Sequence, residues 1–104
     1  RHIDYKNRSA ECILDIGARD MWGKGIGTSA MSLILGFAFY ELNLHRVYLQ
    51  VFSFNERAIK LYEKMGFTHD GKFREEIYRD GRWHHTVIMS ILKKEYLNKE
   101  QSDL

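Results

Sequence analysis

The feature that most constrains the fold is a strand–loop–helix–strand pattern in the first half of the sequence. Residues 9–16 have an apolar bias that favours a short strand, and residues 28–42 are apolar on nearly every side of a helix. Residues 45–52 alternate between apolar and polar side chains, as a half-buried strand does. Because a helical crossover returns the chain to the same end of a sheet, the two strands are expected to be parallel neighbours. The helix between them is expected to be mostly buried.

The second half of the sequence predicts a helix followed by a hairpin. Residues 55–65 have helical spacing, with an asparagine that can cap the start and a glycine just past the end. Residues 73–79 and 82–92 flank an Asp-Gly pair, which favours a two-residue hairpin turn. From Lys93 onward the chain is polar and is expected to fray. We therefore expect an α/β fold with a mixed sheet, in a single domain over residues 1–104.

Composition narrows the possible partners. The chain has 104 residues, of which 44% are apolar, enough for one small core. Its 16 basic and 14 acidic residues leave a net charge of +2, too small to indicate a nucleic-acid partner. No apolar run approaches the ~18 residues of a membrane span, so no membrane partner is expected. The lone cysteine, Cys12, fits a reducing, cytoplasmic setting and is expected to lie in the core rather than act as a nucleophile.

A glycine-rich segment at residues 17–27 separates the first strand from the first helix. Glycines let the backbone approach a ligand closely, and the free N–H groups of the first helical turn attract anions such as a pyrophosphate. A tight turn that needs glycine only for its geometry is an equally good explanation. Neither common nucleotide motif is present, because Lys24 is followed by Gly25 and the glycines are spaced G-x-G-x-G.

The second predicted helix carries a possible functional pair. Asn55 and Tyr62 are seven residues apart, so they fall within ~20° of the same helix face and could look into one groove. The simpler explanations are that Asn55 only caps the helix and that Tyr62 is a half-buried core aromatic. Basic residues at Arg57, Lys60 and Lys64 are most simply a solvated face of the same helix.

Both motifs together resemble the GNAT superfamily of acetyl-CoA-dependent N-acetyltransferases. The segment Trp22-Gly23-Lys24-Gly25-Ile26-Gly27 is similar to the pyrophosphate loop of that family, although Trp22 stands where the family usually has Arg or Gln. The segment Asn55–Phe67 resembles its N-x-x-A-x-x-x-Y-x-x-x-G-F motif. The similarity runs from about residue 4 to residue 96. It is strongest to the branch with the ribosomal-protein N-terminal acetyltransferases and the spermidine acetyltransferases.

This resemblance implies an acyltransferase that moves the acetyl group of acetyl-CoA, its cosubstrate, to a primary amine. The amine would belong to a protein N-terminus, a polyamine or a small molecule. Tyr62 would protonate the leaving thiolate. The implied cofactor-binding residues are Ile16, Gly17, Trp22, Gly23, Lys24, Gly25, Ile26, Gly27, Thr28 and Asn55. The resemblance also implies that the first strands and helices of the usual fold are missing, so that the chain is a fragment or completes its sheet with another chain.

The residues leave the base and the assembly open. A base is needed because an alkylamine titrates near ~10 and must attack unprotonated. The resemblance makes Glu11 the leading candidate, because the family sometimes places a glutamate there. Glu75 and Glu76 are the alternatives and are expected on opposite faces of a strand. His84 and His85 are also expected to point in opposite directions, so no metal site is expected. An exposed edge at the first strand predicts a homodimer. The alternative function is a truncated CoA-binding or dimerisation module without turnover.

Overall fold

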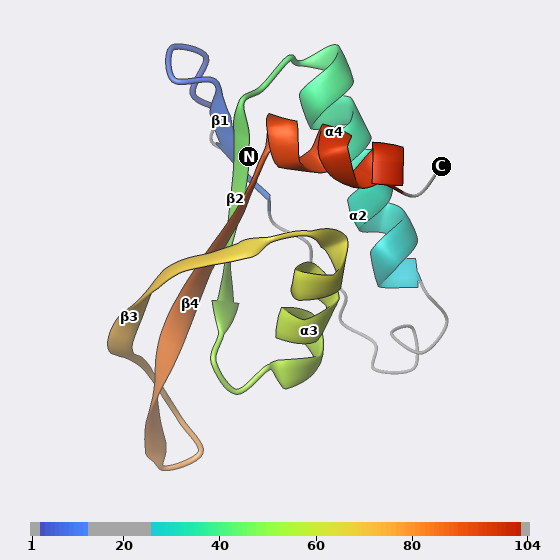
Figure 1. Cartoon of the computed structure of the whole chain (residues 1–104). Helices are drawn as coiled ribbons and strands as arrows, with labels where there is room; N and C mark the ends of the chain where they lie inside the picture. Colours follow the sequence, from blue (N-terminus) through green and yellow to red (C-terminus); the bar gives the residue numbers. More distant parts are fainter. Residues whose placement is uncertain (1–2, 13–25, 103–104) are drawn as a thin grey trace.

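The computed structural model describes residues 3–12 and 26–102, and Figure 1 shows the whole chain. In chain order the elements are β1 (Ser9–Glu11), α2 (Ile26–Gly36), the π-helix η1 (Phe37–Glu41), β2 (Arg46–Phe52), α3 (Glu56–Met65), β3 (Thr68–Arg79), β4 (Arg82–Leu92) and α4 (Lys93–Ser102). None of the described helices is long and apolar enough to cross a membrane.

The four described strands form one mixed sheet in the order β1-β2-β4-β3. β1 is parallel to β2, with Glu11 opposite Tyr48, whereas β4 is antiparallel to both β2 and β3. The predicted parallel pair and antiparallel hairpin are therefore confirmed. The expected first strand over residues 9–16 is confirmed for 9–11, and its part from residue 13 onward lies outside the described residues.

The helices α2, α3 and α4 lie on one face of the sheet (Figure 1). Val47, Leu49 and Val51 of β2 point to this helix face and are at most 7% exposed, because they pack in the core with residues of the helices. The alternate residues of β2 point the other way. We call the opposite side of the sheet the outer face; in the described residues it carries Glu11 of β1, Tyr48, Gln50 and Phe52 of β2, and Thr86 of β4.

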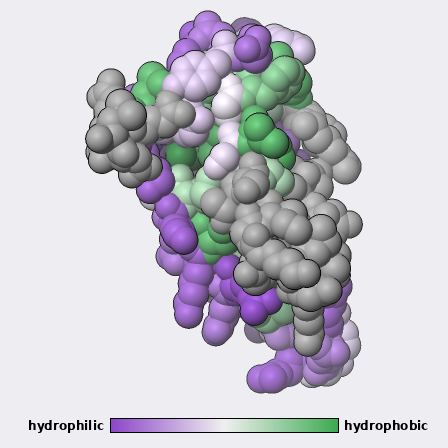
Figure 2. Space-filling model, turned by 90° about the vertical axis from the view of Figure 1, so that its right-hand side faces the viewer, coloured by the Kyte–Doolittle hydropathy of each residue, from purple (hydrophilic) through white to green (hydrophobic). Residues whose placement is uncertain are grey.

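The long apolar helix differs from the prediction in two ways. It covers α2 and then widens into the π-helix η1, in which the Leu42 amide donates to the Phe37 carbonyl at 3.0 Å. It is also not buried all round, because only one stripe of a helix can face a sheet. Leu35 is fully buried, but Leu33 is 76% exposed and Phe37 57%. Figure 2 views this side of the molecule and shows hydrophobic surface among hydrophilic side chains.

The prediction of a frayed tail after Lys93 is wrong. The chain forms α4 instead, and the Leu92 amide donates to the Glu95 carboxylate at 2.9 Å where the helix begins. Tyr96 holds α4 to the core, with its ring centroid 5.1 Å from that of Phe39. Eight of the ten residues of α4 are polar or charged, so its composition predicted fraying, whereas packing of Tyr96 on the core keeps the helix in place.

The expected hairpin is present and longer than predicted, since β3 begins at Thr68. Asp80 and Gly81 form its turn with φ angles of 56° and 75°, as the Asp-Gly pair predicted. The pairing is irregular between Phe73 and Ile77, where β3 takes more residues than its partner. The strand thus contains a bulge beyond its midpoint.

Candidate active site

Asn55 caps the helix that carries the candidate pair. Its side-chain oxygen accepts a hydrogen bond from the Ala58 amide at 3.2 Å, and its own amide donates to the Phe52 carbonyl at 2.9 Å. These bonds fix the start of α3 directly after β2. They confirm the capping role that the sequence offered as the simpler explanation. The side-chain NH₂ of Asn55 makes no hydrogen bond with a described residue, so it is free to donate to a ligand.

Tyr62 lies two turns further along α3, on the side that faces the sheet. The residue is 6% exposed, and its ring centroid is 5.7 Å from that of Phe67. Burial raises the pKa of the Tyr62 phenol above its ordinary value, and the nearby Cys12 thiol raises the pKa further. No described residue forms a hydrogen bond with its hydroxyl. Tyr62 is therefore a core aromatic that carries a protonated phenol beside the end of β1.

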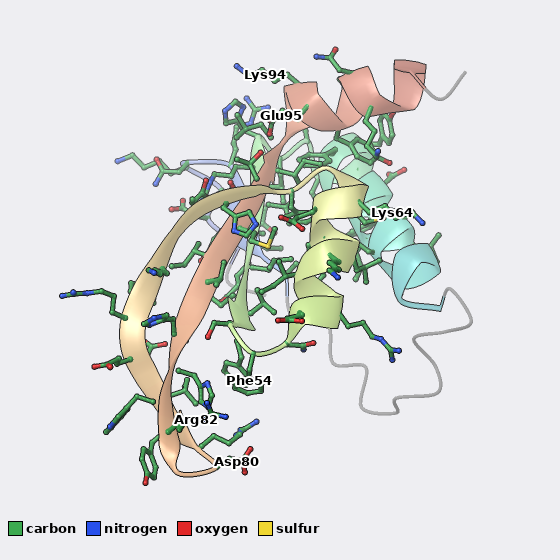
Figure 3. The ribbon with its side chains drawn as sticks, turned by 60° about the horizontal axis from the view of Figure 1, so that its bottom comes forward. Phe54, Lys64, Asp80, Arg82, Lys94 and Glu95 are labelled. Atoms are coloured by element: carbon green, nitrogen blue, oxygen red, sulfur yellow. The ribbon has the colours of Figure 1, made fainter. Side chains whose placement is uncertain are left out.

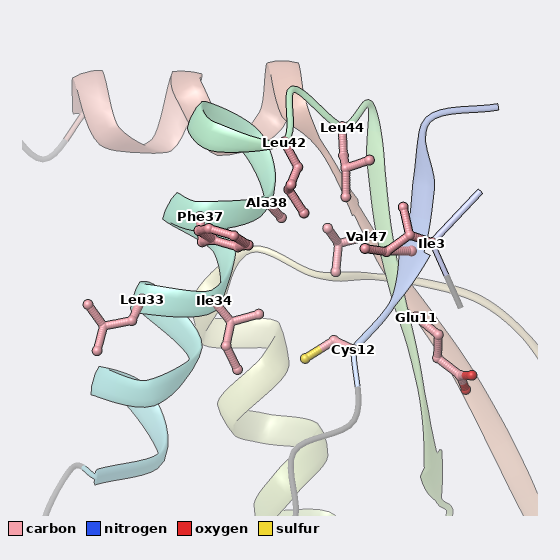
Figure 4. Close-up of a pocket in the computed structure, with 11 residues that line it drawn as sticks. Ile3, Glu11, Cys12, Leu33, Ile34, Phe37, Ala38, Leu42, Leu44 and Val47 are labelled. Atoms are coloured by element: carbon pink, nitrogen blue, oxygen red, sulfur yellow. The ribbon is translucent and has the colours of Figure 1, made fainter. Parts of the chain in front are cut away.

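Glu11 lies at the same end of β1 but on the other side of the sheet. Gln50 of β2 donates a hydrogen bond from Nε2 to the Glu11 carboxylate at 3.3 Å. Figure 4 shows that Cys12 points towards α2 and α3 whereas its neighbour Glu11 points away from them. The Cys12 amide donates to the Tyr48 carbonyl at 2.7 Å and so continues the pairing of β1 with β2. A carboxylate and a phenol thus approach the end of this strand from opposite faces of the sheet.

The structure describes only the end of the glycine-rich segment, where α2 begins. The predicted binding residues Ile16, Gly17, Trp22, Gly23, Lys24 and Gly25 lie outside the described residues. Ile26, Gly27 and Thr28 form the first turn of α2. Gly27 therefore lies inside the helix, which begins two residues before the predicted start at Thr28. The free backbone N–H groups of this first turn are of the kind that bind anions.

An apolar pocket that sequence reasoning missed lies between β1 and the α2–η1 segment (Figure 4). Its volume is about 420 Å³. The lining residues are Ile3, Ala10, Glu11, Cys12, Leu33, Ile34, Phe37, Ala38, Leu42, Leu44 and Val47. Glu11 is the one charged residue among them, and its side chain points away from α2 (Figure 4), so the pocket offers little to a phosphate. Its helix is apolar on nearly every side, so the pattern of residues could not distinguish the exposed Leu33 from the buried residues of the same helix.

Glu75 and Glu76, the alternative candidates for the base, lie in an irregular part of β3 instead of the regular strand that was predicted. Glu75 has a φ of 49° within the bulge of β3, and its amide donates to Nδ1 of His85 at 2.9 Å. The regular alternation that placed Glu75 and Glu76 on opposite faces is therefore broken there. His84 is held separately, through a 3.1 Å hydrogen bond between its Nε2 and the Arg79 carbonyl. Among the described residues no group of three or more His, Cys, Asp or Glu could hold a metal ion.

Comparison with known families agrees with this arrangement. The model of the acetyltransferase (GNAT) domain matches residues 1–68. The chain belongs to the GNAT acetyltransferase family. It is 38% identical over 99 residues to spermidine N(1)-acetyltransferase of Vibrio cholerae, covering 95% of this chain and 57% of that protein. It is also 38% identical over 95 residues to a Bacillus subtilis protein named as a ribosomal N-acetyltransferase, YdaF, covering 91% of this chain and 51% of that protein.

Solved structures show the same fold. The crystal structure of spermidine/spermine N-acetyltransferase SpeG from V. cholerae, in complex with manganese ions, matches with a TM-score of 0.83 and 39% identity. That match covers 93% of this chain and 56% of the solved chain. The chain therefore spans about half the length of the relatives it matches. The mixed sheet with its helices is confirmed as a GNAT fold over the part that this sequence represents.

Proposed function

We propose that this chain transfers an acetyl group from acetyl-CoA to a primary amine by direct attack. The observation that carries the proposal is the position of Tyr62, whose protonated phenol lies beside the end of β1 on a helix that Asn55 caps. Membership of the GNAT family supplies the reaction class. The relatives named for spermidine and for ribosomal acetylation support a polyamine or a protein N-terminus as the acceptor.

Each candidate side chain has a distinct task in this reaction. Glu11 takes the proton that the attacking amine must lose, from the outer face. The new C–N bond forms as the C–S bond of the thioester breaks, and a backbone N–H near Gly17 stabilises the developing oxyanion. Tyr62 gives its proton to the leaving sulfur from the helix side. A phenol with a raised pKa stays protonated at neutral pH, so Tyr62 is ready to donate.

The cosubstrate would be held by backbone and amide groups. Residues 22–28 would bind the pyrophosphate with backbone N–H groups, helped by the positive end of α2. Ile16 and Gly17 would pair with the pantetheine arm, and the free NH₂ of Asn55 would donate to it. We further propose a cytoplasmic homodimer, since β1 pairs only with β2 among the described strands and Cys12 is a free thiol.

The experiment combines binding and turnover. Acetyl-CoA at 100 times its Kd should stabilise the fold by about 2.7 kcal/mol and raise Tm by about 10 °C or more, whereas NAD should do much less. Gly25→Val should abolish the shift, because a β-branched side chain blocks the backbone of the loop. Gly71→Val is the matched control: a Cβ there meets nothing within 4 Å, so the shift should persist.

Release of CoA thiol with a panel of amines then measures turnover. A melting shift without thiol release from any amine would favour a CoA-binding module instead of an enzyme. An unchanged shift in Gly25→Val would mean that CoA binds away from the glycine-rich segment. Sedimentation of the chain as a monomer at high concentration would contradict the proposed dimer.

A further inference from the structure

Two arginines face each other at the end of the hairpin. Arg79 of β3 lies directly opposite Arg82 of β4. Arg82 stands four residues from Thr86 on β4, so the alternation of side chains places both arginines on the outer face. Like charges at directly opposite positions of a sheet repel each other. Neither arginine forms an ion pair with any residue that the structure describes. One acidic residue, Asp80, lies in the turn between them, so the end of the hairpin carries a net positive charge that a bound anion would neutralise.

Aromatic rings hold one of these arginines in place. The Arg79 guanidinium carbon lies 5.2 Å from the ring centroid of Phe52 and 5.5 Å from that of Phe54, and the two rings are stacked 5.3 Å apart. His84 contacts the Phe54 ring at 4.7 Å and bonds to the Arg79 carbonyl. Figure 3 shows Phe54 beside the end of the hairpin. A guanidinium laid on rings keeps its edge donors available for a planar, bidentate partner.

This arginine pair shares the outer face with the candidate base. Gln50, which bonds to Glu11, stands two residues before Phe52 on β2, so about 6.6 Å separates their Cα atoms. Glu11, Gln50, Phe52 and Arg79 therefore follow one another along this face. Between Phe52 and Phe73 on the same face, the Thr86 hydroxyl is buried and makes no hydrogen bond. That oxygen is closed to solvent, so the arginines provide the charged contacts available to an acceptor at this end of the face.

We propose that Arg79 and Arg82 bind a carboxylate of the acceptor, so that the site selects a peptide amine over a polyamine. The inference rests on the proposed acetyl transfer and names its substrate class. The reacting N-terminal amine would lie at Glu11, and an acidic side chain at the third or fourth position of the peptide would reach Arg79. The two arginines would repel a polyamine, because all of its amines are cationic at neutral pH.

The test uses two amidated tetrapeptides that differ only in Asp or Asn at the third position. Binding to the chain is measured by fluorescence anisotropy, independently of turnover. The Asp peptide should bind more tightly than the Asn peptide and than spermidine. Arg79→Gln should raise the Kd of the Asp peptide by about three- to tenfold and leave the Asn peptide nearly unchanged. Arg74→Gln is the matched control: it removes one positive charge elsewhere on β3 and should leave the Kd of both peptides unchanged.

Two results would overturn the inference. In the first, Arg79→Gln weakens binding of the Asp and Asn peptides by the same factor. In the second, the unaltered chain binds spermidine more tightly than the Asp peptide. The preference should also weaken as salt rises, since exposed charge pairs are screened. If the Asp preference holds but no amine is acetylated, the anion site stands and the proposed enzyme activity fails. If amines are acetylated but the chain shows no preference for the Asp peptide, the proposed enzyme activity stands and the anion site fails.

Discussion

Replacing Tyr62 by Phe separates catalysis from packing at the candidate site. The change removes one oxygen and keeps the ring that packs against Phe67. No described residue bonds to that oxygen, so the free energy of unfolding should change by less than about 1 kcal/mol. Tyr62→Ala, in contrast, would remove the whole ring from a site that is 6% exposed, at a cost of about 3–5 kcal/mol. Only the Phe variant therefore tests chemistry without unfolding the chain.

The expected kinetic effect is large. A positioned general acid contributes about 10²–10⁴ in rate, so kcat for acetyl transfer should fall by that factor in Tyr62→Phe. The melting shift caused by acetyl-CoA should stay nearly the same, because the hydroxyl acts on the leaving sulfur rather than in binding. Tyr78→Phe, on a tyrosine that is 63% exposed on the hairpin, is the matched control and should keep its kcat.

The pH profile gives a second readout of the same phenol. Because burial raises the pKa of Tyr62, the acid form persists above the ordinary value of ~10, and its loss should not limit kcat below that pH. The stability from this raised pKa is complete below pH ~10 and is lost as the pH rises through the folded value. With a saturating acceptor and chemistry as the slow step, near-normal kcat in Tyr62→Phe would refute the acid role.

Two stability predictions test other parts of the fold. Tyr96→Ala should lower Tm by roughly 10 °C, because Tyr96 packs α4 against Phe39. The amides of α4 should then exchange rapidly with solvent hydrogen. An unchanged Tm would mean that α4 contributes nothing to the core. Thr86→Val should raise the free energy of unfolding by about 1 kcal/mol, since it removes a buried hydroxyl without a partner. A lower Cm in urea would show that this hydroxyl is satisfied in solution.

The sequence by itself determined the features that depend on local backbone chemistry. An asparagine followed by helical spacing capped α3 as expected, and Gly66 closed that helix with a φ of 104°. The Asp-Gly pair formed its turn, and the alternation along β2 placed Val47, Leu49 and Val51 on the core side. Each of these signals works over a few residues, so no distant part of the chain was needed to interpret it. The two motifs that resembled the GNAT family are of the same local kind.

Tertiary structure decided which of these residues meet. The sequence could not show that Tyr62 is buried in the core, with Cys12 at the end of the first strand close enough to affect its pKa. The path of α4 depends on contacts of Tyr96 with Phe39 and Tyr40, in a helix that ends more than fifty residues earlier. The placement of Arg79 over the rings of Phe52 and Phe54 depends on strand register and on the bulge that precedes it. Long-range contacts of this kind follow from how complete faces pack, and a local pattern contains no information on its distant partner.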